Sequence, residues 1–260
     1  MSLNDAAPPM SRKGEQGSCA HRYVEGVGID EALRRYSDKL TSEGASSEEF
    51  NRAFLEASSL ITQHILQAVV GMHQQGRGIC DIKPGNVRVS MAPNDTILGG
   101  TLLDLGGAVA HDGPFCNRPF SMMYNVENAS PELVRAIVGS DCGSDQESQE
   151  HISVMAHDVW AVGCLLASLV TGSGLFKAQS TGLTFDQRAA AVAQQHRRWE
   201  SSLAHADAVD QAQDPILKDL LECLPAEKYN AVCCWLTTVM QPDRCSRVTA
   251  QAALDSLKQL

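Results

Sequence analysis

Apolar and polar residues follow two different rhythms along the chain, and each rhythm predicts one kind of element. The longest helical rhythm runs over residues 48–75, where apolar side chains recur every three or four positions. Glu48 and Glu49 suit the positive end of a helix dipole, and Gly76 and Gly78 mark the other end. The pattern therefore predicts one long amphipathic helix in the first half of the chain.

A period of two follows this helix over a short stretch. Residues 86–91 alternate between apolar and polar side chains, and residues 92–96 have the composition of a turn. Residues 97–105 are typical of a second short strand, which is expected to end at Asp104. The pattern predicts a β-hairpin near the middle of the chain.

Helical periodicity returns over most of the other segments. Helices are expected over residues 29–40, 130–138 and 156–172. Within the last of these, the apolar run over residues 159–170 is too short to span a bilayer and predicts a buried helix. The fold class is therefore α+β, mostly α-helical with a short central β-hairpin. Four further helices are expected over residues 185–204, 214–224, 227–240 and 249–260.

Two polar segments are expected to lie outside the folded core. Residues 1–20 lack the apolar core of a signal sequence and have the composition of a disordered terminus. Residues 139–151 are rich in Gly, Ser and acidic side chains, which predicts a mobile loop. The folded domain is then expected to span residues 21–260, with a short strand and turn over residues 21–28.

Composition narrows the classes of molecule that the chain is expected to bind. The chain has 31 acidic and 21 basic side chains, so its net charge of −10 disfavours nucleic acid or an anionic membrane as the main partner. An ATP site stays compatible with this charge, because local cations and Mg²⁺ can outweigh it near a phosphate. The nine cysteines contain no C-x-x-C pair, which predicts reduced thiols in an intracellular, cytoplasmic protein.

The stretch GICDIKPGN, residues 78–86, contains the candidate chemistry. Phosphoryl transfer needs a carboxylate that orients or accepts the proton of the attacking hydroxyl, and a lysine that offsets charge. It also needs an amide and a second carboxylate that hold Mg²⁺ on the phosphates. Asp81, Lys83, Asn86 and Asp104 are the side chains that match these four roles. Taken alone, an Asp before Lys-Pro-Gly-Asn is more often a turn former.

Further motifs follow in order, and together they make the chain resemble the large, C-terminal lobe of a eukaryotic-type protein kinase. CDIKPGN (80–86) resembles the catalytic loop H-R-D-x-K-x-x-N, and LLDLGGA (102–108) resembles the D-F-G segment. ASPEL (129–133) resembles the A-P-E motif, and HDVWAVGCLL (157–166) resembles the buried central helix of the family. QPDRCSRVTAQAAL (241–254) resembles the terminal P-D-P-x-x-R-x-T signature.

The resemblance implies a protein serine/threonine kinase that transfers phosphate from ATP to protein hydroxyls, so a protein substrate or partner is expected. It implies Asp81 and Lys83 as catalytic residues. It also implies that Lys83, Asn86 and Asp104 bind the cofactor, with Asn86 and Asp104 as Mg²⁺ ligands. Lys83 in the loop indicates the Ser/Thr branch of the family.

Structural roles are implied for three more residues. By resemblance, Glu132 and Arg247 form the buried ion pair of the family. Asp158 would brace the catalytic loop by accepting hydrogen bonds from backbone N–H groups.

The first departure from the family concerns the small lobe, which is expected to be missing. No G-x-G-x-x-G loop and no V-A-I-K lysine precedes Tyr23. Two alternatives to an active kinase therefore stay open. The chain is either a catalytically inactive pseudokinase that serves as a scaffold, or a fragment of a full-length kinase. An exposed apolar face is expected where the small lobe would dock.

The second departure lies in the catalytic loop itself. Ile79 and Cys80 stand in place of the family's His and Arg. Loss of the arginine removes the usual anchor for an activation-loop phosphate, although Ser121 and Tyr124 lie in that segment. Ile79 is expected to pack against Leu105, which would keep this part of the core apolar.

The third departure is Arg88, which stands where an apolar side chain normally lies under adenine. An arginine at this position would either clash with the base or point away from it. A register slip of the strand would put Val87 or Val89 in its place.

Overall fold

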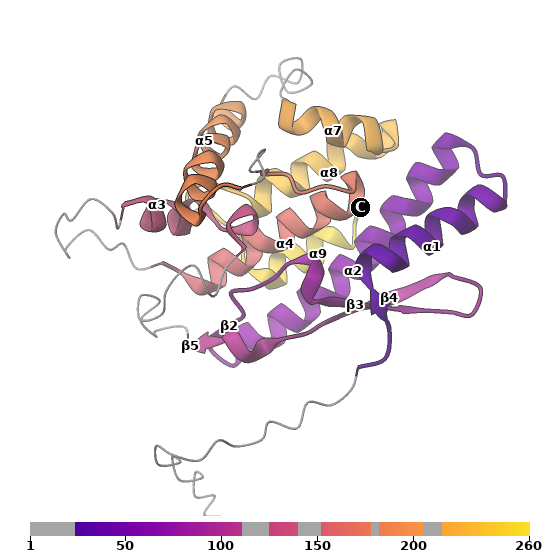
Figure 1. Ribbon diagram of the computed structural model, residues 1–260, viewed down its shortest axis with the longest axis horizontal. Helices are drawn as coiled ribbons and strands as arrows, with labels where there is room; N and C mark the ends of the chain where they lie inside the picture. Colours follow the sequence, from indigo (N-terminus) through magenta and orange to yellow (C-terminus); the bar gives the residue numbers. More distant parts are fainter. Residues whose placement is uncertain (1–23, 111–124, 140–151, 178–181, 205–214) are drawn as a thin grey trace, which may run out of the picture.

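The computed structural model describes five ranges of the 260-residue chain (Figure 1), namely 24–110, 125–139, 152–177, 182–204 and 215–260. The expected disordered segment, residues 1–20, lies outside these ranges. Ser121 and Tyr124 also lie outside them. The same is true of residues 140–151, which form nearly all of the expected mobile loop.

Helices form most of the described chain, and most of them begin and end close to the predicted positions. The predicted helix over residues 185–204 has the same bounds as α5. The described α-helices are α1 (Ile29–Ser42), α2 (Ser47–Gln74), α3 (Pro131–Gly139), α4 (Val154–Thr171), α5 (Phe185–Ala204), α7 (Pro215–Cys223), α8 (Ala226–Val239) and α9 (Ala250–Leu257).

The strands are short and form two antiparallel sheets. The order in the larger sheet is β1-β3-β4, and β2 pairs with β5 in the smaller one. In the larger sheet Val89 lies opposite both Val27 and Gly100, which confirms the predicted hairpin. The strands are β1 (Val27–Gly28), β2 (Arg77–Gly78), β3 (Val87–Met91), β4 (Ile97–Leu102) and β5 (Val109–Ala110).

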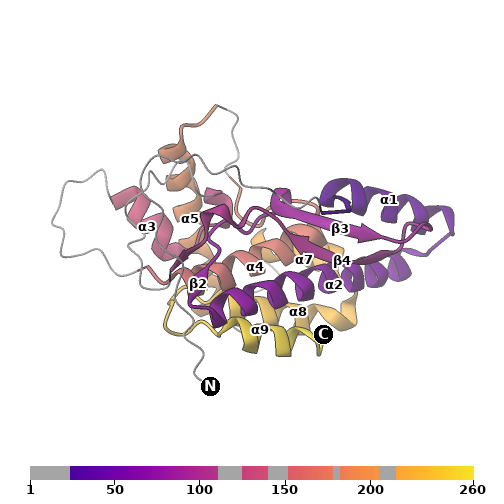
Figure 2. The same cartoon turned by 90° about the horizontal axis from the view of Figure 1, so that it is seen from below.

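Helix α2 begins at a well-formed cap. The Ser46 hydroxyl accepts a hydrogen bond from the Glu49 N–H at 3.3 Å, and the Glu49 carboxylate accepts one from the Ser46 N–H at 2.9 Å. This reciprocal pair satisfies two N–H groups that a helix start otherwise leaves without partners. The helix then runs beneath the β3–β4 hairpin, as Figure 2 shows, and contacts α4 and α9. Val87 and Val89 point from the sheet into the shared core.

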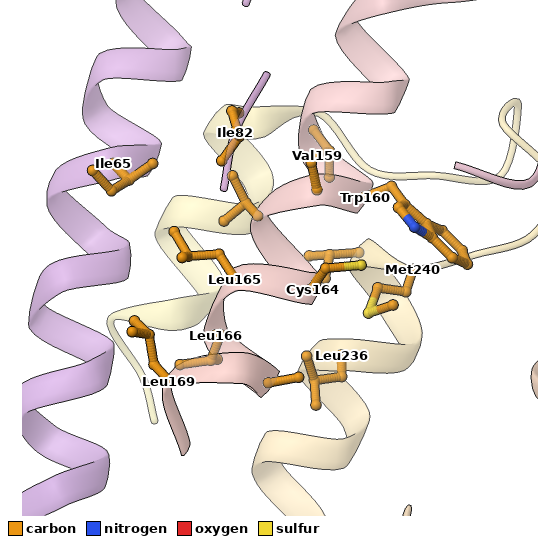
Figure 3. Packing of buried hydrophobic residues seen from close by; sticks show 14 of the residues in the cluster. Ile65, Ile82, Val159, Trp160, Cys164, Leu165, Leu166, Leu169, Leu236 and Met240 are labelled. Carbon is orange, nitrogen blue, oxygen red and sulfur yellow. The ribbon is translucent and has the colours of Figure 1, made fainter. Parts of the chain in front are cut away.

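Helix α4 is the centre of the core and is buried along almost its whole length. Figure 3 shows it between α2 and α8, with Leu165 and Leu169 toward α2 and Cys164 on the side of Met240. Gly163 allows the close approach of α8, because a Cβ at this position would lie 2.5 Å from the Met240 side chain. The predicted buried helix is therefore confirmed.

The length of α4 differs from the sequence expectation. The helix has 18 residues and a mean hydropathy of 1.6, so by length and composition alone it could cross a membrane. However, 78% of this apolar window is buried inside the protein. Packing against α2 and α8 therefore accounts for its apolar composition without a membrane.

Candidate functional site

The loop between β2 and β3 carries the candidate chemistry, and a buried carboxylate in α4 anchors it. Asp158 is fully buried and accepts hydrogen bonds from the N–H groups of Ile79 at 2.7 Å and Cys80 at 2.8 Å. The Nε2 atom of His73, in the last turn of α2, lies 3.0 Å from the same carboxylate. The expected bracing role of Asp158 is therefore confirmed.

Gly78 makes this close approach sterically feasible. A Cβ at Gly78 would lie 2.6 Å from the Val154 side chain and 3.3 Å from the Asp158 carboxylate. Any larger residue would push the start of the loop away from α4 and lengthen the bonds to Asp158. Gly78, which marks the end of the helical pattern in the sequence, therefore also allows the loop to lie close to α4.

The Asp81 carboxylate lies at the front of the loop, and its two oxygens have different surroundings. Oδ2 accepts hydrogen bonds from Lys83 Nζ at 2.6 Å and from Asn86 Nδ2 at 2.8 Å. The same Asn86 amide also donates to the Asp81 backbone carbonyl at 2.9 Å. Oδ1 is buried and has no hydrogen-bond partner among the described residues. One oxygen is therefore held in place while the other can accept a proton from an incoming group.

Asp104 lies beside Asn86 because of the hairpin register. Val87 opposes Leu102, and the Leu103 N–H donates to the Asn86 carbonyl at 2.7 Å. The predicted strand end at Asp104 is wrong, since β4 ends at Leu102. Asp104 instead has left-handed backbone angles, φ 56° and ψ 61°, and an exposed side chain. Asp is among the residues that tolerate this conformation best.

The donor set of Asn86 and Asp104 fits a magnesium ion that shares its ligands with a nucleotide. Mg²⁺ is usually held by one or two carboxylates together with phosphate oxygens and water, and dedicated protein cages are rare. The described residues contain no group of three or more His, Cys, Asp and Glu side chains that could hold a metal ion. The amide and the carboxylate at one end of the hairpin are the kind of partial site that Mg²⁺-ATP requires.

Ile79 and Leu105 differ in burial, and the expected contact between them stays a prediction. Ile79 is fully buried in the main apolar cluster, whereas Leu105 is 44% exposed. Leu105 begins a short 3₁₀ turn directly after the left-handed Asp104, and this turn brings its side chain to the surface. The replacement of the family's histidine by Ile79 therefore keeps this part of the core apolar.

The orientation of Arg88 rules out the expected register slip. Val87 and Val89 are buried, and Arg88 between them is exposed opposite Thr101. The alternation of the strand therefore places both valines in the core and Arg88 on the other side of the sheet. The alternative of a register slip, which would put Val87 or Val89 in the position of Arg88, does not occur.

Polar side chains lie on the outer face of the β1-β3-β4 sheet, and the expected apolar docking face stays a prediction. Arg88, Ser90 and Thr101 are exposed on it. We call these three residues the outer sheet face. The large apolar side chains exposed in the described part of the chain are Leu98, Leu105 and Val138.

A buried ion pair lies behind the loop, and the expected partners form it. Arg247 Nη1 lies 2.8 Å from Glu132 Oε1, and Arg247 Nη2 lies 3.1 Å from Glu132 Oε2, with both side chains almost fully buried. Burial alone would raise the pKa of Glu132, but the hydrogen bonds and the charge of Arg247 outweigh it and lower the pKa. Arg247 also donates to the Ala156 carbonyl in α4, which connects the pair to the anchor of the loop.

Sequence reasoning missed three residues that hold the loop. His73, Asn128 and His157 each bond to the loop or to Asp158 from segments far away along the chain. The signal for His73 and His157 was weak, because a histidine in an apolar helical pattern is most often a core residue. Asn128 directly precedes the ASPEL motif, but nothing in the sequence indicates its bond to the Ile82 carbonyl.

Comparison with known proteins agrees with this geometry. The model of the protein kinase domain matches residues 24–256. A protein of Oryza sativa subsp. japonica that carries the name cyclin-dependent kinase F-2 is 25% identical over 279 residues, which cover 95% of this chain and 75% of the relative. Mitogen-activated protein kinase kinase kinase 17 of Arabidopsis thaliana is 28% identical over 160 residues, which cover 62% of this chain and 37% of the relative.

The extent of the family match bears on two expectations. Because the match spans nearly all of the described chain, it supports the kinase-like fold, but it does not confirm that the small lobe is missing. The catalytic loop, the A-P-E-like segment and the buried central helix all lie inside the matched range. The chain belongs to the protein kinase family.

Proposed function

We propose that the chain is a protein serine/threonine kinase module whose catalytic loop transfers phosphate from ATP to a hydroxyl group of a protein. One observation carries the proposal. Asp81 has one carboxylate oxygen fixed by Lys83 and Asn86, while the other is buried and has no partner among the described residues. A carboxylate held in this way is suited to orient a substrate hydroxyl and accept its proton.

The other residues of the loop would support this step. Lys83 lies beside Asp81, where its charge would offset the charge of the group in transfer. Asn86 and Asp104 would hold Mg²⁺ at the end of the hairpin. When bound, the ion would neutralise charge on the phosphates of ATP. The net charge of −10 favours a protein partner over nucleic acid or an anionic membrane.

We also propose that this chain corresponds to the large lobe of a protein kinase alone. The strands of the described residues form only a three-stranded and a two-stranded sheet, and both lie on the helical lobe. The α- and β-phosphates of ATP would then have few partners within the described part of the chain. Affinity for ATP would therefore be lower than in a site that contacts all three phosphates.

A second function, that of a scaffold without catalysis, is favoured by the outer sheet face. Arg88 is exposed on the side of the sheet where the resemblance places adenine. Ligand pockets are lined mostly by apolar side chains, so a charged side chain at this position does not favour a pocket for the base. In this second function the chain would bind a partner protein through its helical surface.

Transfer of labelled phosphate from ATP tests the first function. The wild-type chain is expected to label a protein substrate, and Asp81→Ala is expected to lose this transfer. If Asp81→Ala transfers as well as the wild type, the assignment of Asp81 is wrong. If the wild-type chain transfers nothing at millimolar Mg²⁺-ATP, the scaffold function is favoured.

A further inference from the structure

The backbone of Cys80, the residue directly before Asp81, is held at both its N–H and its carbonyl group. Cys80 has a positive φ of 69°, which is uncommon for any residue except glycine and needs support from its surroundings. On one side, the Cys80 N–H donates to Asp158 Oδ1 at 2.8 Å. On the other side, the Cys80 carbonyl lies 3.3 Å from His157 Nε2. The Cys80 carbonyl belongs to the peptide bond with Asp81, so the bond from His157 helps to set the orientation from which the Asp81 side chain starts.

The protonation of His157 follows from its hydrogen bonds. The Ser130 N–H donates to Nδ1 at 3.3 Å, so Nδ1 carries no proton. The proton of the neutral ring is then on Nε2, which donates to the Cys80 carbonyl. His157 is 2% exposed, and this burial lowers its pKa, which keeps the ring neutral.

Ser130, the partner of His157 Nδ1, lies in a different segment from the catalytic loop. Ser130 ends the segment 125–130, and members of this segment, with Pro84 of the catalytic loop, line a cavity of about 770 Å³. Within the same segment, Asn128 Nδ2 donates to the Ile82 carbonyl at 3.2 Å. The segment is therefore tied to the catalytic loop at two points, one directly and one through His157.

We infer that His157 is a positioning residue that fixes the Cys80–Asp81 peptide bond and joins it to segment 125–130. Its ring acts as a bridge with two distinct ends, since Nε2 holds the catalytic loop and Nδ1 holds Ser130. The effect expected on phosphoryl transfer rests on the proposed function, whereas the effect on loop order does not. A histidine that merely filled space in the core would influence neither selectively.

Two substitutions separate the ends of this bridge. His157→Gln can place an N–H near the position of Nε2 and so keep the bond to the Cys80 carbonyl. His157→Asn can place an oxygen near the position of Nδ1 and so keep only the bond from Ser130. His157→Ala removes both bonds. His196→Ala is the matched control, because it removes another buried imidazole, one that packs against Trp160 and Phe176.

Alkylation of individual cysteines by iodoacetamide, followed by mass spectrometry, reports on the loop without any need for catalysis. Cys80 is 2% exposed and burial raises the pKa of its thiol, so it reacts only when the loop opens. Cys164 in α4 is 1% exposed and reacts only when the core opens. The ratio of the labelling rate of Cys80 to that of Cys164 therefore isolates local opening of the loop from global unfolding.

We expect His157→Ala to raise this ratio about tenfold or more, the range for loss of a buried hydrogen bond. His157→Gln should restore most of the wild-type ratio, and His157→Asn should not. His196→Ala should leave the ratio unchanged, even where it lowers overall stability. In a transfer assay, His157→Ala should lower kcat while the KM for ATP stays the same.

An unchanged ratio in His157→Ala would overturn the inference, as would a restoration by Asn that equals the restoration by Gln. The two levels of the proposal fail separately. If the wild-type chain transfers no phosphate but the labelling ratio responds as expected, the proposed function is wrong and the positioning role of His157 stands. If transfer occurs but His157→Ala changes neither the labelling ratio nor kcat, the positioning role is wrong.

Discussion

The underside of the catalytic loop and the outer sheet face are built in opposite ways. Beneath the loop, His73, His157 and Asp158 are mostly or fully buried, and each makes polar contacts that hold the loop or its anchor. We call these three residues the loop anchor. The three residues of the outer sheet face, by contrast, are exposed to solvent.

This difference shows which part of the candidate site the fold specifies tightly. Buried polar groups are costly unless every partner is present, so a complete loop anchor indicates that the geometry of the loop is specified. The outer sheet face has no such constraint, and its polar composition suits contact with water. The fold thus specifies the geometry around Asp81 more tightly than it specifies the side chains of the outer sheet face.

The largest expected effect comes from breaking the ion pair behind the loop anchor. Glu132→Ala leaves Arg247 buried without its carboxylate and should lower the free energy of unfolding by about 3–5 kcal/mol. Urea denaturation measures this change. The exposed pair of Arg34 and Asp38 supplies the control, since Asp38→Ala should change stability by less than about 0.5 kcal/mol. Equal effects of the two substitutions would contradict the assignment.

Removal of the central carboxylate of the loop anchor should have the next largest effect. Asp158→Ala leaves the N–H groups of Ile79 and Cys80 buried without acceptors, which should cost about 2–4 kcal/mol of unfolding free energy. Hydrogen exchange gives a more local measurement, because these two amides should lose their protection. Amides in α9 should keep their protection relative to the global stability. A uniform loss throughout the chain would instead indicate a general packing defect.

A third prediction concerns acidic pH and His196, which packs edge-on against Trp160 and Phe176. Burial lowers the pKa of His196 to about 3, and the charges of Arg135 and Arg247 act in the same direction. In the unfolded chain this histidine takes up a proton near pH 6.5, whereas in the folded chain it stays neutral at that pH. Stability from this group is therefore complete above pH 6.5 and falls as the pH drops toward 3.

By pH 5 this loss should reach about 2 kcal/mol. His196→Phe keeps an aromatic ring at the position but cannot take up the proton. The difference in unfolding free energy between pH 7 and pH 5 should therefore be smaller in the variant by about that amount. Identical pH dependence in the two proteins would show that His196 does not titrate on unfolding.

The smallest effect on stability is expected on the outer sheet face. Arg88→Leu should change the free energy of unfolding by less than about 0.5 kcal/mol, because the side chain is exposed. The same substitution should strengthen binding of ATP, since it restores an apolar surface at that position. Isothermal titration calorimetry compares the two dissociation constants, with Ser90→Leu as the control on the same face. Weaker binding by Arg88→Leu would mean that the arginine contacts the nucleotide.

Much of the fold could be predicted from the sequence because helices leave a local signal. The bounds of α5 and the alternation around Arg88 follow from periodicity alone. The pairing of Glu132 with Arg247 spans 115 positions and could be expected only from the resemblance. The contact of His73 with Asp158 depends on how α2 packs against α4, and neither local segment encodes that packing. The exposure of Leu105 depends on the left-handed turn at Asp104, which the apolar pattern does not reveal.

The most direct test of a functional phosphoryl-transfer site is the melting temperature of the chain with and without Mg²⁺-ATP. At about fifty times the dissociation constant, ATP should add roughly 2 kcal/mol and raise the melting temperature by about 5 °C. The rise should disappear in Asp104→Asn and when EDTA removes the metal. A chain whose melting temperature does not change at millimolar Mg²⁺-ATP would contradict the account and favour the scaffold function.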